Sequence, residues 1–435
     1  MVTKEVLDFL DFAAASPTAW HAAAKLSEKL ETSGYERLGE GQRWNLCQGK
    51  SYYVIRNGSS LIAFTLPKGR AMSFRITAAH GDSPTFRIKA VPELKALSHY
   101  TQLDTEPYGG MIMSTWLDRP LSVAGRLMVR EGNRIVPRLV APDRDLCVIP
   151  NVPIHFNREV NNGYNWKPQV DLVPLWGSEK AKSLQQVMAE EANCEPEEIV
   201  GFDLCLVNRV PGCVWGQDED YISAGRLDDL ECAWACMESL TASDAEDHVN
   251  VCCVFDNEEV GSGTMQGADG TFLEDTLARI AFCLGLGLEE KKRMLAGSLL
   301  VSADNAHACH PNHPELFDSV NRVWMNEGVV IKHNARQKYT TDAVTSALFS
   351  EICRRAGVPV QHFANRSDLP GGGTLGNIST RHVSLPSVDI GLAQLAMHSA
   401  WETAGAKDLP MMTQALRAFY AQAITQEQDG VYRFE

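Results

Sequence analysis

Residues 249–263 read VNVCCVFDNEEVGSG, a mostly apolar run that ends at Phe255 and passes directly into acidic residues. An apolar, β-rich run of this length, bounded by polar and glycine residues, is typical of a strand buried on both faces. Similar runs occupy 74–79, 298–302 and 329–331, and a helical pattern lies near each of them. The alternation of such strands with helices predicts an α/β fold.

Helices are expected where apolar residues recur at intervals of three and four. Two are predicted near the N-terminus, with Ser16 as the cap of the second helix and a proline at its first helical position. Residues 341–356 form another, opened by Thr341 and Asp342 and followed by a glycine that stops it. A last helix is expected over 411–424.

The middle of the chain, about 92–220, has a different character. It holds short β-like pieces such as SVAGRLMVR (122–130), many turn residues, and one expected helix near 178–192. These features predict a mainly β domain, inserted between two halves of an α/β domain at 1–91 and 221–435.

Composition restricts the classes of function. The 435 residues include 40 basic and 55 acidic ones, and the net charge of -15 disfavours non-specific binding to nucleic acid or to an anionic membrane. No apolar run is long enough for a spanning helix, and the N-terminal MVTKEVLDFLDF has charges where a signal peptide needs an apolar stretch. Twelve scattered cysteines, mostly in apolar segments, read as reduced core thiols. We therefore expect a cytoplasmic protein.

Polar clusters that follow apolar runs mark the candidate site, because ligands of open α/β sheets bind beyond the carboxyl ends of strands. Each of five clusters supplies His, Asp or Glu, a ligand set that suits zinc, cobalt or manganese. So many carboxylates favour two divalent cations about 3.5–4 Å apart. The clusters are AAHGDSP (78–84), SAGRLDDL (223–230), FDNEEVGSG (255–263), SADNAHACHP (302–311) and QLAMHSAWE (394–402).

Glu258 and Glu259 stand side by side after a strongly apolar strand. Two adjacent carboxylates repel each other unless cations or protons compensate, so one can bind metal while the other moves protons. His307, His310 and His313 have the spacing of a metal cluster, yet three histidines in a turn-rich loop are as often surface residues or supports of the ligands. Their role is left open.

The ordered series of motifs resembles the M18 family of metallopeptidases, the aspartyl aminopeptidase group, along nearly the whole chain. The resemblance implies a mixed-sheet α/β/α metallopeptidase domain with an inserted, mainly β dimerisation domain. The series comprises DFAAASPTAWHA, AAHGDSP, IHFNREVN, RLDDL, DNEEVGS, SADNAHACHPN, VVIKHNARQKYTTDA, RSDLPGGGTLG and LAMHSAWE.

The metal ligands follow from this resemblance. It implies that Asp228 bridges two divalent metal ions, with Glu259 and His398 completing one site and His80 and Asp304 the other. The expected metal is zinc, with cobalt and manganese as alternatives.

The same resemblance implies the remaining catalytic roles. Glu258 is expected to be the general base for a metal-bridging water, and Asp82 to orient His80. The family's inserted domain builds dimers and then a tetrahedral dodecamer, so His155 of IHFNREVN is expected to enter the active site of a neighbouring subunit.

The family's specificity for N-terminal Asp and Glu implies that Lys332 meets the substrate carboxylate, with Tyr339, Gly372 and Thr374 lining the same site. The less favoured alternative is that Lys332 is a surface lysine at a strand end. Asp229 departs from the family's usual Asn, which adds negative charge near the proposed metals.

The expected function is therefore a metal-dependent aminopeptidase that removes Asp or Glu from the N-terminus of short peptides. Two alternatives remain: the same chemistry on neutral N-terminal residues, and a non-catalytic, self-assembling scaffold.

Overall fold

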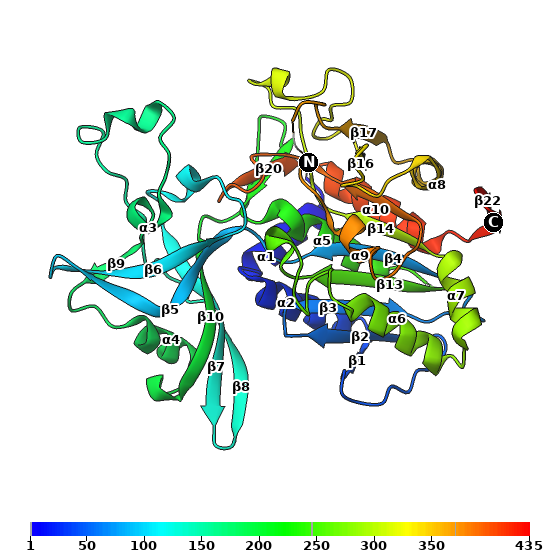
Figure 1. Cartoon of the computed structure of the whole chain (residues 1–435), viewed down its shortest axis with the longest axis horizontal. Coiled ribbons are helices and arrows are strands. Elements are labelled where there is room, and N and C mark those ends of the chain that lie inside the picture. The colour runs from blue at the N-terminus through cyan, green and yellow to red at the C-terminus, as the bar shows by residue number, and fades with distance from the viewer. Residues whose placement is uncertain (1, 245–246, 370) are drawn as a thin grey trace.

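The computed structural model describes residues 2–244, 247–369 and 371–435 and has two lobes (Figure 1). The larger lobe is built on a nine-stranded mixed sheet. Its strands, in spatial order, are β1 (Glu36–Leu38), β2 (Ser51–Arg56), β3 (Ser60–Thr65), β13 (His248–Phe255), β4 (Ser73–His80), β14 (Leu299–Ala303), β18 (Ser387–Gly391), β16 (Val329–His333) and β17 (Val360–Ala364).

The centre of this sheet is parallel. Strands β13, β4, β14 and β18 run side by side in the same direction, whereas β3 and β16 are antiparallel to their inner neighbours. Every residue of β4 and β13 is buried, as expected for strands covered on both faces. The strands predicted at 74–79, 249–255, 298–302 and 329–331 are confirmed.

Helices cover both faces of the sheet, which makes the larger lobe an α/β/α sandwich. Alternate side chains of β13 enter opposite cores: Cys252 and Val254 pack with one group of helices, Val251 and Cys253 with the other. The first group is α1 (Lys4–Ala15), α2 (Ala19–Thr32), α5 (Leu227–Thr241), α8 (Ala343–Ala356) and α10 (Asp408–Ala421). The second is α6 (Phe272–Cys283), α7 (Leu288–Ala296) and α9 (Leu375–Ser379).

The smaller lobe, which we call the inserted lobe, is an antiparallel six-stranded sheet over residues 85–208 with its own apolar core. It lies to the left of the nine-stranded sheet in Figure 1. The domain boundaries at 92 and 220 stay a prediction. The strands of the inserted lobe, in spatial order, are β8 (Arg134–Val140), β7 (Leu121–Glu131), β10 (Ile199–Asn208), β5 (Thr85–Ala96), β6 (Tyr100–Tyr108) and β9 (Leu175–Ser178). The lobe also contains helices α3 (Pro168–Asp171) and α4 (Leu184–Ala192).

A third sheet lies between the lobes and brings distant segments together. Strand β12 pairs with β20 from Tyr221 opposite Gly405 to Ala224 opposite Glu402. This pairing sets the start of α5 beside the segment that carries His398. The sheet order is β11 (Cys213–Trp215), β12 (Tyr221–Ala224), β20 (Glu402–Gly405), β19 (Ala393–Leu395) and β15 (Ala306–His307), and the chain ends in the hairpin β21 (Ile424–Gln428) and β22 (Val431–Phe434).

Two local predictions are wrong. Ser16 does not cap the second helix: its N–H bonds to Ala13 at the end of α1, and the hydroxyl of Thr18 accepts the N–H of His21 to cap α2. The cysteines are all unpaired, but they are not all core residues, because Cys47 and Cys213 are exposed. Within the described ranges, no helix is both long and apolar enough to cross a membrane.

Candidate metal centre

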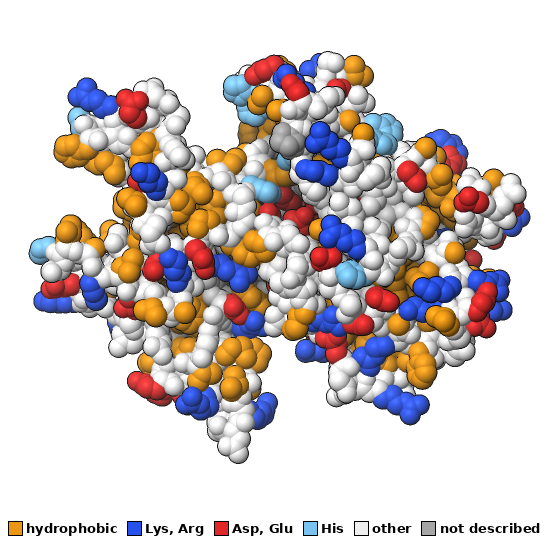
Figure 2. Space-filling view, in the orientation of Figure 1, with side chains coloured by type: hydrophobic (Ala, Val, Ile, Leu, Met, Phe, Trp, Pro, Cys, Tyr) orange, Lys and Arg blue, Asp and Glu red, His pale blue; other side chains and the backbone are white. Residues whose placement is uncertain are grey.

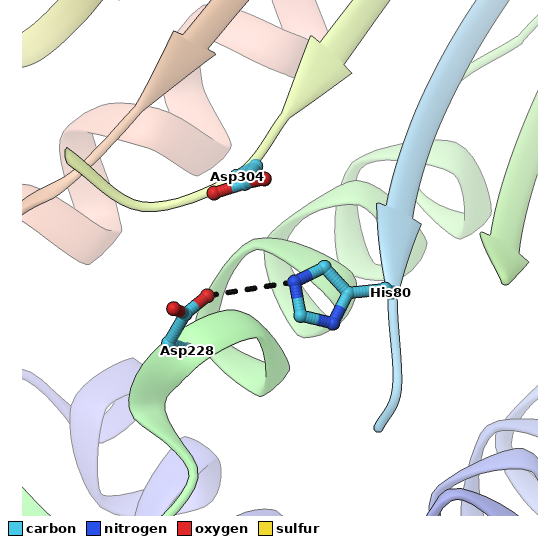
Figure 3. A group of neighbouring side chains, drawn as sticks. All are labelled: His80, Asp228 and Asp304. Atoms are coloured by element: carbon cyan, nitrogen blue, oxygen red, sulfur yellow. Dashed lines mark ion pairs between the residues drawn. The ribbon is translucent and has the colours of Figure 1, made fainter. Parts of the chain in front are cut away.

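Two groups of side chains at the edge of the large sheet have the composition of metal sites. His80, Asp228 and Asp304 form one, and Asp228, Glu259 and His398 form the other; within each group the ligand atoms lie within 4.8 Å of one another. Figure 3 shows the side chains of the first group pointing toward one another from three separate elements. Asp228 belongs to both groups, so one carboxylate links them.

These residues lie at the ends of strands and helices or in the short segments that follow them. His80 is the last residue of β4, and Asp304 follows β14 directly. Asp228 lies at the start of α5, where the backbone is not yet helical and its peptide bond to Asp229 is cis. Glu259 lies in a short 3-10 turn after β13, and His398 lies between β19 and β20 with a left-handed φ of 67°. The parallel strands bring the first ligands to one sheet edge.

Hydrogen bonds fix the orientation of both histidines. The Nδ1 atom of His80 lies 3.1 Å from the carbonyl of Asp82, which leaves its Nε2 3.5 Å from Asp228 Oδ1. In the same way, His398 Nδ1 bonds to the carbonyl of Gly110, while its Nε2 lies 3.2 Å from Asp228 Oδ2 and 3.4 Å from Glu259 Oε2. Each ring therefore presents one nitrogen to the shared carboxylate.

The electrostatics of the groups suit cations. Burial and the charge of Asp228 raise the pKa of Glu259 well above its ordinary value, and burial raises that of Asp304 despite the nearby Lys332. Asp228 Oδ1 and Glu259 Oε1 are buried and have no hydrogen-bond partner among the described residues. Buried carboxylate oxygens without partners are costly. Divalent cations bound by imidazole and carboxylate would satisfy them, so the residues fit a metal centre.

Glu258 lies beside these groups and has the properties of a proton acceptor. It is partly buried, and burial, reinforced by the charge of Asp304 and opposed by His80, raises its pKa to about 7. Asp82 is buried, and its Oδ1 lies 3.4 Å from His80 Nδ1 and accepts the N–H of Glu258 at 3.2 Å. Asp82 thus contacts both the imidazole and the turn that carries the proton acceptor.

Lys332 is buried beneath the metal groups, with 2% of its surface exposed. Its Nζ donates to the carbonyl of Asp304 at 2.7 Å, to Asp304 Oδ1 at 3.3 Å and to the carbonyl of Asn305 at 3.2 Å. The ring of Tyr339 lies 5.2 Å from the same ammonium. All three N–H bonds of Lys332 therefore have acceptors within the protein.

The other residues expected at the site, Gly372, Thr374 and His155, lie in three different surroundings. Gly372 lines a cavity of about 300 Å³ together with His310 and Met397. Thr374 is buried, and its hydroxyl donates to Asp389 Oδ1 at 2.5 Å. His155 is exposed on the inserted lobe, outside both metal groups.

Asp229 belongs to neither metal group found among the described residues. It is buried, and its Oδ2 accepts the N–H of His80 at 3.2 Å. The three histidines left open separate as well: His310 and His313 stack on each other with ring centroids 5.3 Å apart, whereas His307 packs on Phe363. None of the three belongs to either metal group found among the described residues.

Three contacting residues were not predicted. Glu402 is buried and accepts the N–H of Asp228 at 3.1 Å and that of His398 at 2.7 Å. Its position four residues after His398 in the sequence could have indicated that it lies near the metal groups. Tyr108 and Gly110, which contact Asp82 and His398, lie in a segment with no recognisable motif.

Figure 2 shows a hollow on this face of the molecule that contains acidic side chains, with a histidine at its rim. The fold and this arrangement define an α/β/α protein with a candidate metal centre at its sheet edge.

Comparison with known proteins shows the family to which the chain belongs. Residues 12–420 match the family model described as aminopeptidase I zinc metalloprotease (M18). A probable M18 family aminopeptidase 2 from Clostridium novyi is 43% identical over 95% of this chain and 98% of its own length, and one from Azotobacter vinelandii is 40% identical over 95% and 97%. The chain belongs to the M18 family and is a metallopeptidase of the aminopeptidase type.

Solved structures agree with this assignment. The chain superposes with a TM-score of 0.92 on a chain from the cryo-EM structure of the Ape4 and Nbr1 complex, at 36% identity, covering 96% of this chain and 85% of the other. With the S. cerevisiae mApe1 dodecamer the TM-score is 0.85 at 27% identity, covering 96% of both chains. The expected mixed-sheet α/β/α fold is confirmed.

Proposed function

We propose that this chain is a dinuclear metallo-aminopeptidase that removes single residues from the N-termini of short peptides, with Asp and Glu preferred. The observation that carries the proposal is the pair of metal groups that share Asp228 and contain buried oxygens without partners. Zinc is the expected metal, because the matching family model describes a zinc metalloprotease and the ligands are imidazole and carboxylate.

The chain's own residues supply the proton chemistry. His80, Asp228, Glu259, Asp304 and His398 would hold the cations, which would act as Lewis acids and lower the pKa of a water molecule at the site. Glu258, beside these groups, would accept the proton of the attacking water and return it to the leaving nitrogen. The free N-terminal amine of a peptide would bind beside the metal groups, and a site that holds this amine would release one residue at a time.

The preference for Asp and Glu depends on Lys332. Its ammonium is a buried cation that lies directly behind Asp304, and a substrate carboxylate would have to replace the longest of its contacts, the 3.3 Å one to Asp304 Oδ1. One observation favours the alternative of neutral substrates: Lys332 already has three acceptors and almost no exposed surface. Both substrate preferences would use the same metal groups. They would differ only in whether Lys332 contacts the side chain of the substrate's N-terminal residue.

We further propose that the chain works as a cytoplasmic homo-oligomer, assembled from dimers as a dodecamer. The unpaired cysteines support a reducing compartment, and one structural relative is a dodecamer. His155 is exposed on the inserted lobe, which is compatible with a contact to a neighbouring subunit's site. There it would donate a hydrogen bond to the oxyanion of the substrate.

The experiment is the release of the N-terminal residue from matched Asp-, Glu-, Leu- and Ala-starting peptides, with chelator and with zinc added back. Chelator-sensitive release favouring Asp and Glu is expected. Chelator-sensitive release of Leu and Ala instead would retain the metal chemistry and reject the acidic preference.

Glu258→Gln tests the base and separates an enzyme from a scaffold. We expect kcat to fall by about 100-fold or more with zinc content and oligomer size unchanged. Glu274→Gln, at an exposed position on α6, is the matched control and should behave as the parent. Full activity of Glu258→Gln would exclude the proposed base, and no activity of the parent with any metal would support the scaffold.

A further inference from the structure

The segment Tyr108–Ile112 leaves the inserted lobe at the end of β6 and passes against both metal groups. The hydroxyl of Tyr108 donates to Asp82 Oδ2 at 2.6 Å. Two residues later, the carbonyl of Gly110 accepts Nδ1–H of His398, and the N–H of Ile112 donates to the carbonyl of His398 at 3.0 Å. The inserted lobe therefore contacts one proposed ligand directly and another through Asp82.

The Tyr108 bond is the strongest that Asp82 receives. The backbone N–H groups of Glu258 and Glu259 reach its two oxygens at 3.2 Å each, and His80 Nδ1 lies 3.4 Å away. At 2.6 Å the phenol bond is much shorter, as expected for a hydroxyl that donates to a buried carboxylate. Without it, the Asp82 carboxylate, which lies beside His80 and accepts the N–H groups of Glu258 and Glu259, is held only by longer contacts.

The phenol is itself fixed from two sides. Asn257 Nδ2 donates to the Tyr108 hydroxyl at 2.8 Å, so the phenol proton is directed to Asp82. The guanidinium of Arg87, from strand β5 of the inserted lobe, lies 4.3 Å from the centroid of the Tyr108 ring. Tyr108 thus transmits the position of the inserted lobe to the turn that carries Glu258 and Glu259.

We propose that Tyr108 is a positioning residue of the metal centre, and that through Tyr108–Ile112 the inserted lobe sets the geometry of both ligand groups. This inference rests on the proposed function, because His80 and His398 are ligands only if that function holds. It gives the inserted lobe a role inside its own subunit, separate from any contact between subunits.

Two glycines with a positive φ offer a matched pair of variants. Gly109 has a φ of +76°, and a Cβ there would lie 3.1 Å from Cβ of Glu259, so Gly109→Ala pushes the segment away from the ligand. Gly132, between β7 and β8, has a φ of +60°, and a Cβ there would meet no described atom within 4 Å. Gly132→Ala is therefore a control that places the same strain outside the segment.

The test uses the full chain and Co²⁺, whose visible spectrum reports ligand geometry. We expect Tyr108→Phe to bind Co²⁺ about 10-fold or more weakly, to shift the cobalt absorption bands, and to lower kcat more than it changes KM. Gly109→Ala should shift the bands as well. Tyr100→Phe, at a half-exposed position on the same strand, and Gly132→Ala should match the parent in every readout.

Parent-like Co²⁺ affinity and spectra in both Tyr108→Phe and Gly109→Ala would overturn the inference while leaving the proposed function intact. If Tyr108→Phe fails to fold, the spectrum of Gly109→Ala decides in its place. Failure of the parent itself to bind Co²⁺ would instead overturn the metal centre, and with it this inference.

Discussion

At the scale of single residues, the Lys332–Asp304 contact has two possible roles, and they predict different kinetics. As the substrate's partner, Lys332 affects only acidic substrates. As the partner of Asp304, it offsets negative charge among crowded carboxylates, whatever the substrate. The buried ammonium and its three acceptors support the second role.

Lys332→Met separates these roles. If Lys332 selects substrates, the ratio of kcat/KM for Asp- over Leu-starting peptides should fall by about 10-fold or more, since a charge-assisted contact is lost. We expect this loss of selectivity, measured on zinc-loaded protein with Lys292→Met, at an exposed position on α7, as the control. An equal loss for both peptides would assign Lys332 to the support of Asp304 alone.

His21 makes stability depend on pH. Its ring is mostly buried beside the Thr18 hydroxyl, and burial, together with the charge of Arg226, lowers its pKa to about 4. Between about pH 6.5 and 4 the unfolded chain binds a proton that the folded chain does not, so stability falls as pH falls through this range. The loss from this group alone should be about 2 kcal/mol at pH 5.

Urea unfolding at pH 7.5 and pH 5 measures this effect. His21→Asn should lose about 2 kcal/mol less than the parent between the two pH values, whereas His99→Asn, at an exposed position, should follow the parent. An identical pH response of His21→Asn and the parent would rule out His21 as the titrating group.

At the scale of elements, α8 shows how local residues set the ends of a helix. Asp342 Oδ1 accepts the N–H of Thr345 at 2.8 Å, and the Thr345 hydroxyl accepts the N–H of Asp342 at 3.1 Å. Gly357 ends the helix with a left-handed φ of 70°. Asp342→Ala should therefore lower the free energy of unfolding by about 1 kcal/mol.

Asp342→Asn is the conservative partner of that variant, because an amide oxygen can still accept the Thr345 N–H. Thermal and urea unfolding should show the loss in Asp342→Ala and little of it in Asp342→Asn. A similar loss in both variants would mean that charge, and not the cap, stabilises α8.

Local patterns predicted the elements that local forces determine. The buried strands β4 and β13 were predicted from their apolar runs, and the ends of α8 from Asp342 and its closing glycine. The Ser16 prediction was wrong because a Ser-Pro pair is typical of a helix N-terminus. In the structure, the N–H of Ser16 bonds to Ala13 at the end of α1.

Contacts between distant segments could not be predicted in this way. Tyr108 meets Asp82 and Gly110 meets His398 only because the inserted lobe packs against the sheet edge. Nothing in the spacing of these residues reports that packing. The burial of Lys332 against Asp304 is likewise a product of the tertiary fold.

At the scale of the whole molecule, the net charge of -15 acts on acidic substrates before they reach the site. Two Asp-starting peptides that differ only in the charge of their downstream residues isolate this effect from the pocket. Raising ionic strength from about 10 to 100 mM shortens the screening length from about 30 to 10 Å.

We expect kcat/KM to rise by about twofold or more with salt for the strongly anionic peptide and to change little for the neutral one, since repulsion at long range is screened. Steady-state kinetics at fixed pH and metal concentration measure this. A fall with salt for the anionic peptide would instead indicate an attractive surface around the entrance.

The placement of the inserted lobe within the chain also affects the order in which parts of the protein can fold during synthesis. Strand β4 ends at His80, but its parallel neighbour β13 begins only at His248, after the whole inserted lobe has been synthesised. The lobe's own pairings are more local and can form on the ribosome while β4 still lacks its partner. The proposed metal centre can therefore form only after His398, near the end of the chain, has been synthesised.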